Sequence, residues 1–175
     1  MKKILFTHSY FYPFDPKQWR TAQPYPPYGT IYAAAVMRAC GYEVGLFDTA
    51  LLDHIDGLKS RLEQDQPAFF VIYDDGFNYL TKMCLTRMRE AAFEMARLAQ
   101  AFGCKVIVCS SDSSDHFEQY LNNGADFVLI GEGENTLREL ITTLDADPHA
   151  DLHPIQGIAW RPDGQHTLKN SPRPV

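Results

Sequence analysis

The chain has 175 residues, of which 45% are hydrophobic and 22% charged, a composition typical of one packed globular domain. Its 16 Lys and Arg against 22 Asp and Glu leave a formal net charge of −6, and a mildly acidic domain lacks the clustered basic side chains that bind nucleic acid. No apolar run reaches the roughly 18 residues that span a bilayer, and the N-terminal one is too short for a signal peptide. We therefore expect a cytoplasmic protein that binds neither nucleic acid nor membrane.

Five short apolar runs alternate with amphipathic segments over most of the chain. The runs predict strands at 4–6, 42–48, 69–73, 105–109 and 127–130. The amphipathic segments predict helices at 28–40, 51–62, 85–102, 117–121 and 137–144. Because the strands are continuously apolar, they are expected to be buried on both faces. This alternation predicts a doubly wound α/β fold with a five-stranded parallel sheet in the flavodoxin-like order 2-1-3-4-5.

The chain changes character near residue 145. A polar stretch with two prolines, 145–154, predicts a linker, and residues 155–168 predict a β-hairpin with a Pro-Asp-Gly turn. The last residues predict a second linker, which suggests that the chain is part of a longer protein. We therefore divide it into an α/β domain, residues 1–145, and a linker with hairpin, residues 146–175.

Neither the cysteines nor the histidines predict a metal site. The four cysteines (40, 84, 104 and 109) form no CxxC pair, so we expect buried, unpaired side chains. His149 and His153 have a spacing that suits a metal only on a helix, which Pro148 and Pro154 oppose, so a solvated linker is expected there.

In parallel sheets of this type, ligands bind beyond the carboxyl ends of the strands, near the point where the strand order reverses. That rule selects four loops, at 7–27, 74–79, 110–116 and 131–135. No catalytic residue is identified, and the candidate ligand-binding residues of these loops and the following helix entrance are His8, Ser9, Tyr10, Tyr28, Gly29, Asp74, Asp75, Gly76, Ser110, Ser111, Asp112, Gly131, Glu132, Gly133 and Glu134.

Two of these loops have distinctive local sequences. The turn Gly131-Glu132-Gly133-Glu134 allows close approach of a ligand, but it lacks the third glycine of a dinucleotide-binding loop. Its carboxylates would repel a pyrophosphate and suit a ligand with hydroxyl or amide donors; a plain turn at a helix N-terminus is an equal alternative. Asp74-Asp75-Gly76 is similar to the acidic pair of a receiver domain but follows strand three instead of strand one, and a solvated turn is again the alternative.

The first loop is rich in aromatic residues, which either pack under the loop or cover a flat apolar partner. Seven of the chain's 22 aromatic residues lie here: Tyr10, Phe11, Tyr12, Phe14, Trp19, Tyr25 and Tyr28.

Several motifs together resemble one family, the N-terminal cobalamin-binding domain of class B radical SAM proteins. They are PPYG (26–29), AAAVMR (33–38), GYEV (41–44), GADFVLIGEGENTL (124–137), the hairpin IQGIAWR (155–161) and PRP (172–174). The hairpin and the final prolines are similar to the connection between that domain and the radical SAM barrel. The resemblance covers essentially the whole chain.

The family implies a base-off cobalamin whose corrin lies across the carboxyl ends of the strands, with its nucleotide tail beside the sheet. The CxxxCxxC motif is absent, so S-adenosylmethionine and the [4Fe-4S] cluster would belong to a radical SAM catalytic domain in cis, absent from this chain. The DxHxxG motif is also absent, because Phe6 stands where Asp belongs when His8 is aligned, and cobalamin without a His ligand is expected. The fourth loop reads Cys109-Ser110-Ser111-Asp112 where paired glycines are common.

We therefore expect a cobalamin-binding module that is not catalytic alone, with methyl transfer or another radical reaction carried out by the absent domain. One alternative is an interaction domain of a radical SAM protein that has kept the fold and lost cobalamin. Another is a flavodoxin-like domain for a ligand such as flavin, although Thr7-His8-Ser9 is a poor phosphate loop.

Overall fold

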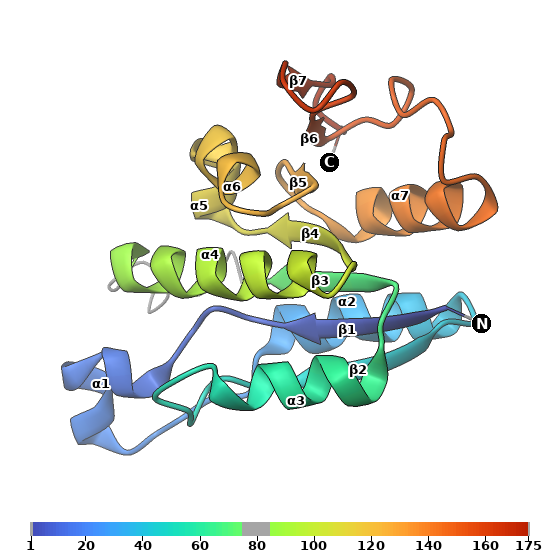
Figure 1. The fold of residues 1–175 in the computed structure, drawn as a ribbon. Coiled ribbons are helices and arrows are strands. Elements are labelled where there is room, and N and C mark those ends of the chain that lie inside the picture. Colours follow the sequence, from blue (N-terminus) through green and yellow to red (C-terminus); the bar gives the residue numbers. More distant parts are fainter. Residues whose placement is uncertain (1, 75–84, 175) are drawn as a thin grey trace.

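The computed structural model describes residues 2–74 and 85–174, and its strands form one sheet (Figure 1). The strands are β1 (Lys3–Thr7), β2 (Glu43–Phe47), β3 (Phe69–Tyr73), β4 (Lys105–Cys109), β5 (Phe127–Leu129), β6 (Ile158–Trp160) and β7 (Leu168–Lys169). Their order is β2-β1-β3-β4-β5-β6-β7, with β1 to β5 parallel and β6 and β7 antiparallel. The predicted fold class and parallel order are confirmed. The hairpin extends the same sheet, while the division of the chain at residue 145 stays a prediction.

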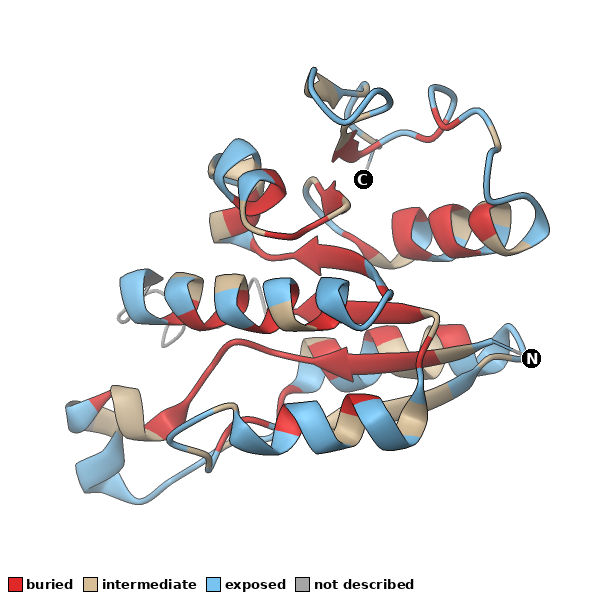
Figure 2. Ribbon diagram, viewed as in Figure 1, coloured by how far each residue is buried: buried red, intermediate tan, exposed pale blue. Residues whose placement is uncertain are grey.

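Helices cover both faces of this sheet. They are η1 (Tyr12–Phe14), α1 (Pro16–Thr21), α2 (Tyr28–Ala39), α3 (Asp56–Asp65), α4 (Leu85–Ala101), α5 (Ser111–Asp115), α6 (Phe117–Asn122) and α7 (Glu134–Ala146). One apolar core joins the sheet to α2 and α7, and a second joins it to α3, α4 and α6. Figure 2 shows most of β1, β3, β4 and β5 buried between helices whose outer sides are exposed. The expectation that every strand is buried on both faces is wrong for β2, which lies at the sheet edge and whose residues are exposed or only half-buried. None of the helices in the described ranges has the length and apolar content that a bilayer crossing requires.

The double cover explains the continuous apolar runs. In β1, Ile4 and Phe6 pack in the α2/α7 core while Leu5 packs in the opposite core, and all three are fully buried. Successive side chains of a strand point to opposite faces, so each position must be apolar when both faces are covered.

Three local predictions are wrong. The helix expected from residue 51 begins at Asp56, and Leu51 is 65% exposed in a preceding turn. The loop expected at Ser110–Asp115 contains α5, because Ser110 and Ser113 form a reciprocal cap that supplies a helix start without an apolar pattern. The expected linker is partly packed, since α7 extends to residue 146 and Leu152 is buried against the α2/α7 core.

The cysteines divide into two kinds. Cys104 and Cys109 are buried, as predicted, but Cys40 is exposed because it caps the C-terminal end of α2 on the surface. Cys84 lies outside the described residues.

Candidate functional site

The carboxyl ends of β1 and β3 are joined by a side-chain contact. The backbone N–H of Ser9 donates to Oδ1 of Asp74 at 2.6 Å, and its hydroxyl donates to Oδ2 at 2.7 Å. Burial raises the pKa of the Asp74 carboxyl, and the two hydrogen bonds from Ser9 only partly oppose that rise. Two of the predicted site residues are therefore in direct contact with each other.

His8 points toward β2 instead. Its Nε2 lies 2.9 Å from Oδ1 of Asp48 and its Nδ1 lies 3.3 Å from Oγ1 of Thr49, while the residue is only 2% exposed. The hydrogen bond from His8 holds the pKa of the Asp48 carboxyl below its usual range. Sequence reasoning missed Asp48 and Thr49, although they directly follow strand two and a search of all carboxyl ends would have included them.

Hydrogen bonds among the protein's own side chains fix the loop after β4. Ser110 is buried in its reciprocal cap with Ser113, and the exposed Ser111 begins α5. Asp112 accepts two hydrogen bonds from Arg89 (2.7 and 2.5 Å) and one from the Tyr120 hydroxyl (2.8 Å). Burial alone would raise the pKa of Asp112, but its hydrogen bonds hold that pKa below the usual range. Asp112 therefore anchors α5 to α4 and α6.

The glycine-rich turn after β5 has an exposed half and a packed half. Gly131 and Glu132 are exposed, and no atom lies within 4 Å of a side chain placed on Gly131. Gly133 is buried at the start of α7, and a Cβ there would lie 2.5 Å from Sγ of Cys109 and 3.1 Å from Oη of Tyr73. The turn thus needs glycine at 133 for close packing against β3 and β4.

Cys109 and Tyr73, the last residues of their strands, lie among buried groups beside this turn. Burial raises the pKa of the Cys109 thiol to about 12 and raises that of the Tyr73 phenol as well. Glu134, the first residue of α7, is half-buried and adds to both shifts through its negative charge. Their burial and close approach to Gly133 make this cluster part of the packing between β3, β4 and the start of α7.

Part of the aromatic loop packs under itself, which is one of the two predicted alternatives, and covering of an apolar partner stays a prediction. Tyr10 is buried and stacks on Tyr25 with 5.2 Å between ring centroids, so part of the loop packs under itself. Tyr28 is 70% exposed and stacks on Tyr32 at 6.3 Å, beside the half-buried Gly29. The predicted Asp75 and Gly76 lie outside the described residues.

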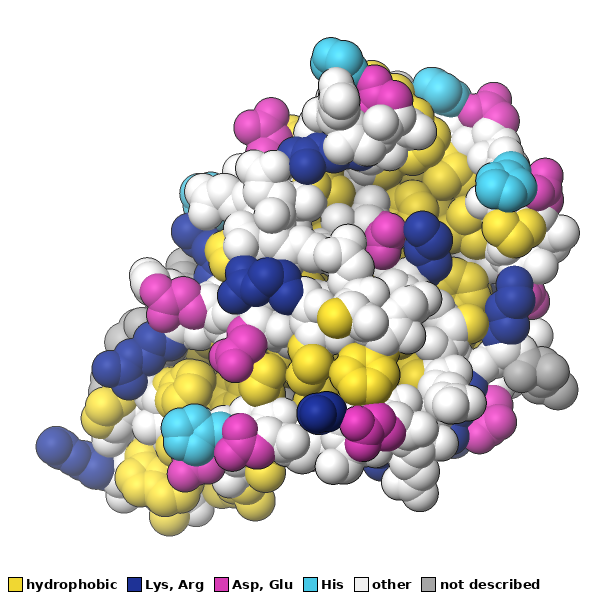
Figure 3. Space-filling view, viewed as in Figure 1, with side chains coloured by type: hydrophobic (Ala, Val, Ile, Leu, Met, Phe, Trp, Pro, Cys, Tyr) yellow, Lys and Arg dark blue, Asp and Glu magenta, His cyan; other side chains and the backbone are white. Residues whose placement is uncertain are grey.

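Most of the exposed large apolar side chains belong to the first third of the chain. Among the described residues, the exposed large hydrophobic ones are Trp19, Tyr28, Ile31, Tyr32, Leu51 and Phe102. All except Phe102 lie on segments that follow β1 or β2, and Figure 3 shows hydrophobic side chains over the region of α1. Within residues 2–74 and 85–174, no group of three or more His, Cys, Asp and Glu residues is arranged to hold a metal ion.

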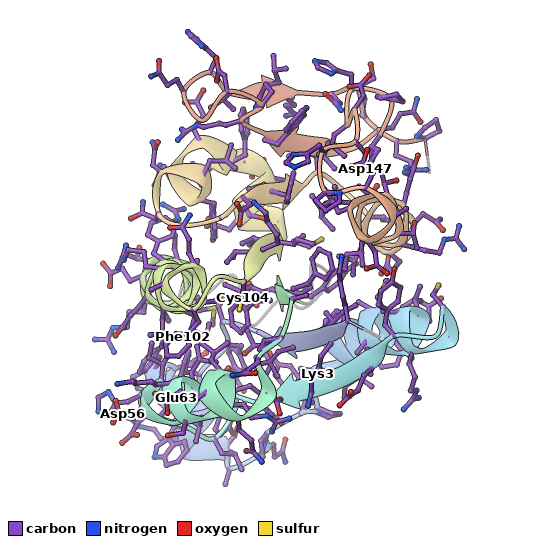
Figure 4. All side chains as sticks on the ribbon, turned by 45° about the vertical axis from the view of Figure 1, so that its right-hand side comes forward. Lys3, Asp56, Glu63, Phe102, Cys104 and Asp147 are labelled. Atoms are coloured by element: carbon purple, nitrogen blue, oxygen red, sulfur yellow. The ribbon has the colours of Figure 1, made fainter. Side chains whose placement is uncertain are left out.

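A surface pocket of about 510 Å³ lies at the opposite, amino edge of the sheet. It is lined by the ends of α3 and α4, including Glu63, Phe102 and Cys104, which Figure 4 labels. This pocket is separate from every loop that the sequence selected.

Comparison with known proteins supports the fold. No protein-family model matches the sequence, and no curated protein matches it. The structure is similar to that of OxsB, a cobalamin-dependent S-adenosylmethionine radical enzyme, solved with aqua-cobalamin and S-adenosylmethionine bound, with a TM-score of 0.67 and 17% identity. Its form with aqua-cobalamin alone gives the same values, and its selenomethionine-labelled apo form gives a TM-score of 0.66. The match covers 100% of this chain and 23% of OxsB.

Proposed function

We propose that this chain is a cobalamin-binding module that works with a radical SAM catalytic domain in the same polypeptide. The observation that carries the proposal is that most of the exposed large apolar side chains among the described residues lie on the segments after β1 and β2. Where such side chains form a contiguous patch, they usually mark a binding site. The likeness in fold to part of a cobalamin-dependent radical enzyme supports the same proposal.

The residues at this edge fit a corrin ring. A corrin is flat and carries neutral amide side chains, so it suits an apolar rim with hydrogen-bond acceptors beside it. Tyr28 and Trp19 supply exposed aromatic surface, and the exposed turn at Gly131 and Glu132 supplies carbonyl and carboxylate oxygens. The space next to Gly133 is filled by Cys109 and Tyr73, so we do not assign the nucleotide tail to that space.

A bound cobalamin would supply a cobalt centre able to carry a methyl group. This chain's own residues would bind and orient the ring. Ser9 and Asp74 join the ends of β1 and β3 beneath the ring, while the exposed Tyr28 side chain would cover its apolar surface and exclude water. Both ring nitrogens of His8 are engaged by Asp48 and Thr49, which supports a base-off cobalamin without a His ligand. S-adenosylmethionine and the [4Fe-4S] cluster would lie in the catalytic domain, and no catalytic residue is assigned here.

The test is a titration with hydroxocobalamin, followed by gel filtration and a visible spectrum of the protein peak. Tyr28→Ser is compared with Phe102→Ser, since both remove an exposed aromatic side chain but at opposite edges of the sheet. We expect stoichiometric retention with a base-off spectrum, about tenfold weaker binding for Tyr28→Ser, and no change for Phe102→Ser. Absence of retention by both this chain and the full-length protein would contradict the proposal, as would equal effects of the two substitutions.

The second candidate is an interaction domain that has kept the fold without the cofactor. The close packing of Gly133 against Cys109 and the commitment of Asp112 to Arg89 favour it. Under this candidate, neither the chain nor the full-length protein retains cobalamin.

A further inference from the structure

His8 and Ser9 are adjacent in the sequence but bind opposite neighbours of β1. The His8 ring contacts Asp48 and Thr49 at the end of β2, whereas Ser9 contacts Asp74 at the end of β3. Because β1 lies between β2 and β3 in the sheet, the two residues fasten the start of the first loop on both sides. Both residues are 2% exposed, while the Asp48 side chain that His8 contacts is half-exposed.

Hydrogen bonding on the β2 side fixes both the His8 ring and the backbone around it. Oδ1 of Asp48 also accepts from the N–H of Ala50 at 2.9 Å, and an ionised carboxylate can only accept, so Nε2 of His8 donates to it. The Thr49 hydroxyl donates to the carbonyl oxygen of His8 at 2.8 Å and lies 3.2 Å from that of Tyr10. The His8 ring is thus held by Asp48 and the His8 main chain by Thr49, two neighbouring residues after β2.

This arrangement leaves His8 without a free nitrogen lone pair directed at solvent. A metal-binding imidazole needs one unprotonated nitrogen aimed at the metal. Here Nε2 carries its proton toward Asp48, and Nδ1 faces Thr49, whose side chain is fully buried. Two charged groups in the described residues face the ring. Asp48 is in contact with it, and Asp74 feels its charge, which partly opposes the rise that burial causes in the Asp74 pKa.

We propose that His8 is a positioning residue that ties the first loop to the end of β2 and thereby holds Ser9 against Asp74. The inference rests on the proposed function, because it assigns His8 a role in shaping the ring-binding edge and no role as an axial ligand of cobalt. Without the ring contacts, the hydrogen bond from Thr49 to the His8 carbonyl oxygen would be left to hold this part of the loop to the end of β2. The Ser9 contacts, one peptide bond away, would then loosen first.

The experiment compares His8→Ala, His8→Gln and the control His116→Gln, a half-buried histidine on the α5–α6 connection. On the protein alone, amide hydrogen exchange of Ser9 is measured by NMR. We expect exchange about tenfold faster in His8→Ala, largely restored in His8→Gln, whose amide can donate to Asp48, and unchanged in His116→Gln. Asp48→Ala should also speed exchange of the Ser9 amide. Because the Asp48 side chain is half-exposed, this variant replaces His8→Ala in the test if His8→Ala does not fold. Unchanged Ser9 exchange in both His8→Ala and Asp48→Ala would overturn the tether.

On the cobalamin-loaded protein, the electron paramagnetic resonance spectrum of the Co(II) form separates positioning from ligation. We expect no nitrogen coupling from protein in the wild type, the same spectrum in His8→Ala, and about tenfold weaker hydroxocobalamin binding in that variant. Nitrogen coupling that disappears in His8→Ala would overturn the inference. If no form retains cobalamin, the proposed function fails, while Ser9 exchange still decides whether the tether exists.

Discussion

Asp74 accepts both the backbone N–H and the hydroxyl of Ser9, at 2.6 and 2.7 Å, across the boundary between β1 and β3. This boundary is the point at which the strand order β2-β1-β3-β4-β5 reverses its direction. Ligands of parallel α/β sheets bind in the crevice at such a point. In this chain a hydrogen-bonded pair joins the ends of the two strands at that point, and both oxygens of the Asp74 carboxyl group accept from Ser9.

Replacing Ser9 with Ala should destabilise the protein by about 1–3 kcal/mol, because Oδ2 of Asp74 then loses its Ser9 hydrogen bond. Urea unfolding measures the change. Ser60→Ala, on the exposed side of α3, is the control and should stay within about 0.5 kcal/mol of the wild type. A Ser9→Ala protein as stable as the control would show that the pair contributes nothing to stability.

The raised pKa of Asp74 predicts a characteristic pH dependence. The folded state holds a proton on Asp74 more tightly than the unfolded state does, so folding takes up a proton between the usual value of 3.8 and the raised one. The contribution of Asp74 to the free energy of unfolding therefore falls as pH rises through that window. Asp74→Asn should remove this component, and urea unfolding from pH 3.5 to 8 compares the two slopes. Parallel curves for variant and wild type would contradict the prediction.

Arg89 and Asp112 should show the opposite behaviour to Asp74. The Asp112 side chain is 9% exposed, so Arg89→Met leaves a nearly buried carboxylate without its cation, at a cost of about 3–5 kcal/mol. The lowered pKa of Asp112 stabilises the fold above the usual value of 3.8, and this contribution is lost as pH falls. Urea unfolding should show that this acid-dependent component is smaller in Arg89→Met, in which Tyr120 and His116 remain beside Asp112.

Two further variants test the Arg89 prediction. Adding Asp112→Asn to Arg89→Met should restore part of the lost stability, because the unpaired charge is removed. Arg87→Met, an exposed neighbour on α4, should change stability little. Equal losses for Arg87→Met and Arg89→Met would rule out a specific ion pair.

The sheet could be predicted because its signal is local. Residues 69–73 and 106–109 are uniformly apolar since helices cover both faces, and alternation with amphipathic segments then indicates a parallel sheet. The helix α5 escaped prediction because Ser and Asp disfavour helix interiors, and only the mutual cap of Ser110 and Ser113 starts it. Docking of the hairpin on β5 depends on pairing between distant segments, which no local pattern specifies.

The candidate site was predicted as a region but not as a set of contacts. The strand-end rule selected Ser9 and Asp74, which are 65 positions apart, but sequence spacing cannot show that they bind each other. Asp112 was selected as a ligand contact, whereas Arg89 and Tyr120 occupy its carboxylate. Burial of Cys109 was predicted, but its close packing against Gly133 was not, because no local pattern shows which residue faces the last position of a strand.

Thiol labelling should separate Cys40 from the two buried cysteines. Cys40 is exposed, while burial raises the pKa of Cys104 to about 11 and that of Cys109 to about 12, which suppresses the reactive thiolate. Iodoacetamide labelling in native buffer, followed by peptide mass mapping, should modify Cys40 first and the other two only after urea unfolding. Native labelling of Cys109 at the rate of Cys40 would show that the Gly133 side of the sheet is open.

The contact between Gly133 and Cys109 offers a sharper test of that packing. A Cβ at residue 133 would lie 2.5 Å from Sγ of Cys109, so Gly133→Ala should destabilise the protein by about 1–3 kcal/mol through overpacking. The control is Gly57→Ala on α3, where the nearest atom, on the Phe47 ring, is 3.5 Å away, and a gain of about 0.5–1 kcal/mol is expected from helix propensity.

Removing the opposing sulfur should relieve the clash. The Gly133→Ala, Cys109→Ala double variant should be more stable than the sum of the two single losses predicts, because the new methyl group fills space that the thiol vacates. Urea unfolding of the four proteins gives the interaction free energy, and strict additivity would mean that the turn relaxes away from β4. Since the turn at 131–134 belongs to the proposed ring-binding edge, the same four proteins should be titrated with hydroxocobalamin. Unchanged affinity in the double variant, together with weaker binding in Gly133→Ala, would tie the position of this turn to cofactor binding.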